Sequence, residues 1–146
     1  MIHIRRMTIE DVDSVSMLEE KTFSMPWHRE SFIEMIKNPL ALYMVACEED
    51  KLAGTCGMIT VAGEADISNV AVDEKYRRQG VAFMLVGEAM HVAAKDYGVK
   101  DFTLEVRASN EAAIGLYEKL GFVSEGIRPG FYEQPVEDAV IMWKRK

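Results

Sequence analysis

Apolar and polar residues follow each other along this chain in two recurring patterns, one typical of strands and one typical of amphipathic helices. Strict alternation over residues 2–5 predicts a strand at the edge of a sheet. Apolar runs bounded by turn residues predict further strands over residues 42–47, 52–61, 67–72, 101–106, 122–127 and 139–143. Apolar residues at helical spacing predict helices over residues 9–23, 28–36, 81–97 and 110–120. The inward faces of the first two helices are expected to hold Val12, Val15, Leu18, Phe32, Met35 and Ile36.

Turn and capping residues mark where these helices begin and end. Thr8 and Asp11 have the spacing of a capping box before the first helix, and residues 24–27 separate it from the second. Gly98 and Gly121 each follow a helix at the position where a left-handed residue commonly ends it. The element order β-α-α-β-β-β-α-β-α-β-β predicts an α/β (α+β) protein with a mixed sheet and helices on both faces. We expect residues 1–146 to form a single domain.

The composition is that of an ordinary globular protein, with 49% apolar and 28% charged residues. A net charge of −7 argues against nucleic acid as the primary ligand, because phosphate binding requires a basic face. The acidity either favours a cationic substrate such as an amine or serves solubility alone. Neither a signal peptide nor an apolar run of the ~20 residues that span a bilayer is visible. We therefore expect a cytoplasmic protein without membrane contact, in which Cys47 and Cys56 are buried, reduced thiols.

The most informative stretch runs from a buried strand into a helix. A charged turn over residues 73–78 follows the strand, and Gly80 comes directly before the helix. Free N–H groups at a helix start bind anions, and a glycine lets the backbone approach a ligand closely. Arg77 and Arg78 add positive charge, so we predict a phosphate site here. Neither Gly-Lys-Ser/Thr nor G-x-G-x-x-G is present, which excludes a Walker-type P-loop and the dinucleotide fingerprint.

The pattern Arg77-x-x-Gly80-x-Ala82, placed between strand and helix, resembles the R/Q-x-x-G-x-G/A loop of the GNAT superfamily of N-acetyltransferases. That loop holds the pyrophosphate of acyl-coenzyme A, and the resemblance extends over essentially the whole chain. It implies the GNAT fold, a mixed, mostly antiparallel twisted sheet of about seven strands flanked by about four helices. Acetyl-coenzyme A is implied as cosubstrate, and we expect no metal because His3, His28 and His91 are dispersed. Contacts to the cosubstrate are implied for Val70, Ala71, Val72, Arg77, Arg78, Gln79, Gly80, Val81, Ala82, Phe83 and Asn110.

Further motifs resemble one branch of that superfamily, the RimI-like enzymes. These bacterial enzymes acetylate the N-terminal alanine of a small-subunit ribosomal protein. The motifs are Phe23-x-x-Pro26-Trp27, L-E-V-R-x-S-N over residues 104–110, A-I-x-L-Y-E-K-L-G-F over residues 113–122, and E-D-A over residues 137–139. This resemblance implies an N-terminal acetyltransferase whose partner is a peptide or protein N-terminus, a ribosomal protein in particular. Two departures are Ala82, where glycine is more frequent, and Phe131, where these enzymes usually carry a tyrosine.

Glu105 and Tyr117 are the candidate catalytic residues. Strand alternation places Glu105 on the face opposite Leu104 and Val106, where it is a catalytic base, an exposed carboxylate, or an ion-pair partner, for example of Arg107. Tyr117 lies on the buried stripe of its helix, as a core tyrosine would. The resemblance implies that Glu105 accepts the proton of the amine and that Tyr117 protonates the leaving thiolate. A phenol and a thiol differ little in pKa, which makes tyrosine a suitable acid for this step.

The remaining site predictions concern the cosubstrate and the peptide. Asn110 could cap its helix, contact coenzyme A, or do both. The backbone of residues 70–72 is implied to pair with the pantetheine arm, although three small apolar residues also suit a plain core strand. Trp27, Phe131 and Tyr132 are implied as walls of the substrate slot. Two alternatives are an acetyltransferase for a small amine, such as a polyamine or aminoglycoside, and a non-catalytic acyl-coenzyme-A-binding or ribosome-assembly module.

Overall fold

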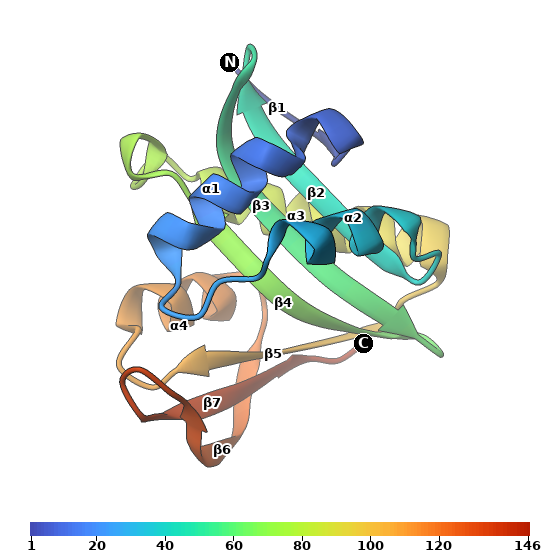
Figure 1. Cartoon of the computed structure of the whole chain (residues 1–146). Helices are drawn as coiled ribbons and strands as arrows, with labels where there is room; N and C mark the ends of the chain where they lie inside the picture. Colours follow the sequence, from blue (N-terminus) through green and yellow to red (C-terminus); the bar gives the residue numbers. More distant parts are fainter.

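The computed structural model describes residues 1–146 and contains one seven-stranded sheet with four α-helices (Figure 1). The strands are β1 (Ile2–Arg6), β2 (Ala41–Glu48), β3 (Lys51–Val61), β4 (Glu64–Val72), β5 (Asp101–Arg107), β6 (Val123–Tyr132) and β7 (Glu137–Lys144). The helices are α1 (Val12–Thr22), α2 (Arg29–Lys37), α3 (Val81–Tyr97) and α4 (Glu111–Lys119). Two short 3₁₀ helices, Ile9–Asp11 and Glu74–Tyr76, precede α1 and α3.

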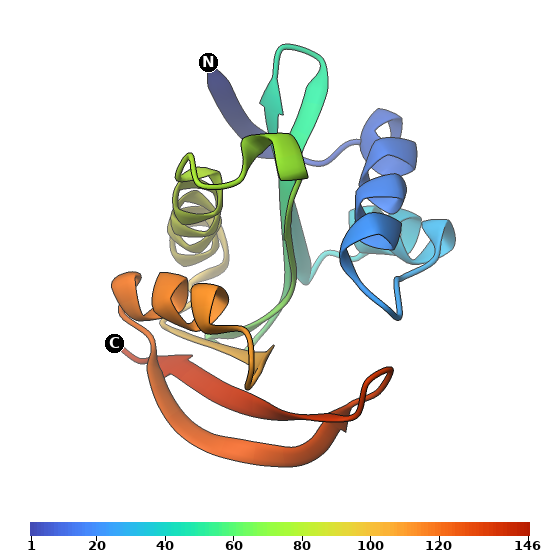
Figure 2. The same cartoon turned by 90° about the vertical axis from the view of Figure 1, so that its left-hand side faces the viewer.

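The strands lie in the order β1-β2-β3-β4-β5-β7-β6, and every neighbouring pair is antiparallel except β4 and β5. The expected mixed, mostly antiparallel sheet is therefore confirmed, and β1 is an edge strand as predicted. Figure 2 shows α1 and α2 on one face of the sheet and α3 and α4 on the other, with the β6–β7 hairpin curving below them. A core of 21 buried residues lies under α3 and α4, and a second core of nine lies under α1 and α2.

Strands β4 and β5 separate halfway along their length. Their parallel pairing joins residues 64–67 to residues 101–104 and stops there, although both strands continue. At the same place β4 carries a bulge, because Gly57 of β3 pairs with Asn69 whereas Met58 pairs with Ile67. A bulge reverses the alternation of side chains that follow it. Ile67 thus packs in the core under α3, whereas Asn69 turns to the opposite face and meets α1.

Two element ends and the burial of one residue differ from the sequence prediction, each for an identifiable reason. The first helix begins with a 3₁₀ turn, and the Asp11 carboxylate accepts the N–H of Thr8 at 2.7 Å. Ile36 is 38% exposed, so its predicted burial was wrong; it lies one position around a short helix from the buried Met35. Strand β6 extends five residues beyond the predicted end at Ile127. The edge position of β6 explains this, because an edge strand tolerates proline and glycine.

Both cysteines are buried free thiols, as predicted. Burial raises the pKa of the Cys56 thiol to about 12 and also raises that of Cys47. Protonated, enclosed thiols are poor nucleophiles, so neither cysteine is suited to covalent catalysis. None of the helices combines the length and apolarity that crossing a membrane requires.

Candidate active site

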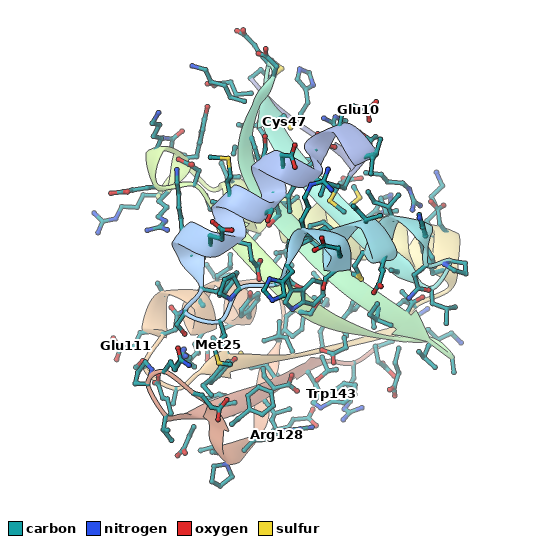
Figure 3. The ribbon with its side chains drawn as sticks, viewed as in Figure 1. Glu10, Met25, Cys47, Glu111, Arg128 and Trp143 are labelled. Carbon is teal, nitrogen blue, oxygen red and sulfur yellow. The ribbon has the colours of Figure 1, made fainter.

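A cavity of about 560 Å³ opens where β4 and β5 separate. Its walls come from the end of α1 and the α1–α2 loop, from β4 and β5, from α4, and from the turn between β6 and β7. Of the predicted site residues, the following line it: Trp27, Val70, Glu105, Asn110, Tyr117, Phe131 and Tyr132. In Figure 3 the side chain of Met25, which also lines the cavity, reaches from the α1–α2 loop toward the C-terminal hairpin.

Glu105 and Tyr117 both line this cavity and come from different elements. Leu104 and Val106 are buried in the core, and Glu105 lies on the other face of β5, as alternation predicted. Its carboxylate makes no hydrogen bond or ion pair within the chain; the alternative pairing with Arg107 is wrong, since Arg107 pairs with Glu137. Tyr117 is 7% exposed and its ring packs on Phe122 at 5.7 Å between centroids. Burial raises the pKa of this phenol, which keeps it protonated in water at any ordinary pH.

Aromatic rings stand on both sides of the cavity mouth. Trp27 packs against Phe32 with centroids 5.6 Å apart, which anchors the α1–α2 loop on the smaller core. On the opposite side Phe131 and Tyr132 meet edge to face at 5.0 Å. Burial and the negative charge of Glu105 raise the pKa of Tyr132, so its hydroxyl remains a donor.

Sequence reasoning missed a buried polar pair at this site, Glu19 of α1 and Asn69 of β4. Each is 3% exposed, and Asn69 Nδ2 donates to the Glu19 carboxylate oxygens at 3.2 and 3.1 Å. The same carboxylate accepts the backbone N–H of Trp27 at 3.2 Å, so it joins α1, β4 and the α1–α2 loop. Burial raises the pKa of Glu19. The signal was available, because Glu19 follows Val12 and Val15 at helical spacing on the buried face.

Several acidic side chains lie in or beside the cavity. Asp66 of β4 faces the same region as Glu105, and burial together with that neighbouring charge raises the pKa of Asp66, which Arg128 lowers in part. Glu133 lines the cavity in the β6–β7 turn. The positive charge of Arg107 is paired with Glu137 at 3.2 Å. A cationic group entering the cavity would therefore meet a favourable field.

The predicted phosphate residues lie outside the cavity, along the continuation of β4 and at the start of α3. Gly80 precedes α3 with φ 76°, and no acidic residue occupies the first turn of this 17-residue helix. Arg78 also has positive φ, 64°, and the Arg77 side chain turns back so that Nε donates to the Val72 carbonyl at 3.2 Å. The side chains of Ala71 and Val81 are buried in the protein. Any ligand contact of those two residues would have to come from their backbone.

Asn110 caps α4, since its side chain accepts the N–H of Ala113 at 3.1 Å. This confirms the capping half of its prediction. The residue also lines the cavity, so the cap and an open face toward a ligand are compatible. The hydrogen bond fixes the start of the helix that carries Tyr117.

Comparison with known proteins identifies the family of the chain. The model of the acetyltransferase (GNAT) family matches residues 12–122. The chain belongs to the GNAT acetyltransferase family. Its seven-stranded sheet with four helices is therefore the GNAT fold, as the loop around Gly80 indicated. Enzymes of this family use acetyl-coenzyme A, and the prediction of an N-acetyltransferase is confirmed.

The relatives of this GNAT chain include proteins of the predicted branch. A Bacillus subtilis (strain 168) protein, described as a putative ribosomal protein bS18-alanine N-acetyltransferase, is 40% identical over 96% of this chain and 93% of its own length. The ribosomal protein bS18-alanine N-acetyltransferase of Escherichia coli (strain K12) is 34% identical over 95% of this chain and 94% of its own length. A crystal structure of the Escherichia coli S18-alanine enzyme superposes with a TM-score of 0.89 and 33% identity, covering 99% of this chain and 94% of that one.

Proposed function

We propose that this GNAT enzyme transfers an acetyl group from acetyl-coenzyme A to the N-terminal α-amine of a protein, the alanine amine of ribosomal protein bS18 or a similar peptide. The observation that carries the proposal is the cavity at the separation of β4 and β5. There an unpaired carboxylate, Glu105, and a protonated phenol, Tyr117, line one space that is walled by two loops. The names of the relatives supply the substrate class.

The residues present suit acetyl-coenzyme A. The unpaired side of β4 beyond Ile67 offers backbone N–H and C=O groups to the pantetheine arm, through Val70, Ala71 and Val72. The first N–H groups of α3 have no acceptor within the helix and suit the pyrophosphate. The positive φ of Gly80 and the open space around it let that backbone come close. We assign contacts with the pyrophosphate end of coenzyme A to residues of the loop and the start of α3, namely Arg77, Arg78, Gln79, Gly80, Val81, Ala82 and Phe83. Asn110, at the start of α4, is assigned a separate contact with coenzyme A.

In the proposed reaction Glu105 takes a proton from the α-ammonium, directly or through water. The neutral amine then attacks the thioester carbonyl carbon and a carbon–nitrogen bond forms. The nitrogen of the resulting tetrahedral intermediate loses its second proton to solvent, and the carbon–sulfur bond breaks to leave the amide. Tyr117 gives its proton to the departing sulfur and regains one from solvent. An α-amine with a pKa of about 8 needs little help to lose its proton near neutrality, so positioning supplies much of the rate. A backbone N–H of β4 directed at the carbonyl oxygen would add roughly 3 kcal/mol.

The substrate end of the cavity suits a small first residue. Trp27 on one wall and Phe131 with Tyr132 on the other leave a slot between rings, and the Tyr132 hydroxyl can bond peptide backbone. The acidic lining attracts a positively charged N-terminus and basic residues behind it.

Mass spectrometry of products tests this proposal. The enzyme is incubated with acetyl-coenzyme A and an Ala-first peptide, and in parallel with spermidine and an aminoglycoside. We expect acetylation of the peptide, with fragmentation placing the group on the α-amine. Acetylation of the small amines in place of the peptide would favour the small-amine alternative, and no transfer to any amine would favour a binding module.

A further inference from the structure

Arg107, at the end of β5, holds the turn between β6 and β7. Its Nη2 donates to the Glu133 carbonyl at 3.0 Å, and its Nη1 donates to the Pro135 carbonyl at 3.0 Å. Nη1 also reaches the Glu137 carboxylate at 3.2 Å. Only 26% of the Arg107 side chain is exposed. Regular pairing of β6 and β7 lapses between residues 128 and 132, so these contacts take the place of ladder hydrogen bonds.

The same guanidinium lies against the cavity wall. Its Cζ stands 4.5 Å from the centre of the Tyr132 ring, whose other neighbour is Phe131 at 5.0 Å. Nη2 is also 3.5 Å from Ser24 Oγ in the α1–α2 loop, which forms the opposite wall. Arg107 therefore touches both loops that enclose the substrate end.

Glu137 carries this arrangement on to α4. Its Oε1 accepts a hydrogen bond from Arg107 Nη1, and its Oε2 accepts one from the backbone N–H of Ser109 at 2.7 Å. Ser109 precedes Asn110, the cap of the helix that holds Tyr117. The contact thus joins two sequence motifs that are far apart in the chain, L-E-V-R-x-S-N and E-D-A.

We propose that Arg107, held by Glu137, is a positioning residue that fixes Tyr132 and the β6–β7 turn as the peptide-side wall of the active site. The role depends on the planar fork of arginine, because several acceptors and a ring are engaged at once. A lysine at this position keeps the charge but can satisfy only part of this set. The inference rests on the proposed peptide substrate and adds the residue that shapes its wall.

The matched control lies at the other end of β7, which begins at Glu137 and ends next to Arg145. Arg145 pairs with Glu125 at 2.9 Å and stacks on Trp143 at 4.0 Å, so it repeats the arginine–glutamate–aromatic arrangement away from the cavity. Arg107→Lys and Glu137→Gln are compared with Arg145→Lys and Glu125→Gln in steady-state kinetics, varying the peptide and acetyl-coenzyme A separately. For Arg107→Lys we expect KM for the peptide to rise by about 10- to 100-fold, since a misplaced wall weakens binding geometry. The KM for acetyl-coenzyme A should stay within about twofold, and the Arg145 and Glu125 variants should match the wild type in both constants.

Hydrogen exchange of residues 129–138 supplies a readout independent of peptide turnover. In Arg107→Lys this segment should exchange faster while the amides of β1 to β5 stay protected. An unchanged peptide KM with unchanged exchange, or an equal rise of both KM values, would overturn the proposal. If the wild type acetylates no peptide, the proposed function fails on its own, and the exchange comparison alone decides whether Arg107 holds the turn.

Discussion

Glu105 and Tyr117 reach the cavity from β5 and α4, and the protein places them in different surroundings. Glu105 has no partner within the chain, which leaves its carboxylate available to a substrate proton. Tyr117 is enclosed, and burial raises the pKa of its phenol, so the phenol stays protonated at a pH where an α-amine is already neutral. These different surroundings suit the proposed roles, in which Glu105 accepts a proton and Tyr117 donates one.

Replacing either group should slow turnover without disturbing the fold. Glu105→Gln and Tyr117→Phe keep the shape of each side chain and remove its acid–base function. Each should lower kcat by about 100-fold or more, the usual contribution of a positioned acid or base. Stopped assays at saturating cosubstrate measure this, with melting temperature as the folding control. Near-native kcat in both variants would mean that solvent handles the protons.

Glu19 should make stability depend on pH. Because burial raises its pKa, the native state retains a proton at Glu19 that the unfolded chain releases. The resulting stabilisation is complete below the unfolded pKa of about 4.3 and is lost as pH rises through the higher native value. In Glu19→Gln the amide can accept the Trp27 N–H and donate to Asn69 Oδ1, which is buried without a partner.

Urea unfolding of wild type and Glu19→Gln between pH 4 and pH 8 measures this dependence. We expect the unfolding free energy of the wild type, relative to the variant, to fall as the pH rises. The variant should be at least as stable near neutrality. A wild-type advantage that grows with pH would show that the ionised carboxylate is the stabilising form.

At the scale of elements, the start of α3 and the bulge in β4 shape the cosubstrate side. Gly80 and Gly98 stand at the two ends of α3, both with positive φ and both with open space where a Cβ atom would stand. Alanine at either position meets the same left-handed penalty of about 1–2 kcal/mol. Only the Gly80 end faces the proposed pyrophosphate site.

Gly80→Ala and Gly98→Ala therefore form a matched pair. Both should lower the melting temperature by similar amounts. Only Gly80→Ala should weaken coenzyme A binding, by about tenfold, or 1.4 kcal/mol. Calorimetric titration with coenzyme A makes the comparison. Equal affinities in the two variants would remove the pyrophosphate from this loop.

Features that depend on the local sequence pattern could be predicted from the sequence. Features that depend on the pairing of distant segments could not. Alternation was enough to place Glu105 opposite Leu104, and glycine was enough to end α3 at Gly98. The inward turn of Asn69 depends on a bulge that appears only when β3 pairs with β4. Likewise the partners of Arg107 lie some 26 to 30 residues away and meet it only once the hairpin has folded.

In the whole molecule, the proposed cosubstrate site and the proposed peptide site meet where β4 and β5 separate. The parallel pairing of β4 with β5 ends at Ile67 and Leu104, although both strands continue. A space therefore opens between them in a sheet whose other neighbouring strands are antiparallel. The proposed cosubstrate side is built by β4 and α3, and the proposed peptide side by the α1–α2 loop and the β6–β7 hairpin (Figure 2). The chain as a whole carries a net charge of −7, which should speed the approach of basic peptides.

The central claim is that the enzyme acetylates the N-terminal α-amine of a protein. Measuring kcat/KM on three peptides tests this claim most directly. One begins with Ala followed by basic residues, one begins with Ala followed by acidic residues, and one has a blocked N-terminus and a single lysine. We expect the first to exceed the third by about 100-fold or more, because a lysine ε-amine has a pKa of about 10.4 and presents no backbone to the slot. At low salt the first should also exceed the second. Equal values for the first and third peptides would contradict N-terminal acetylation.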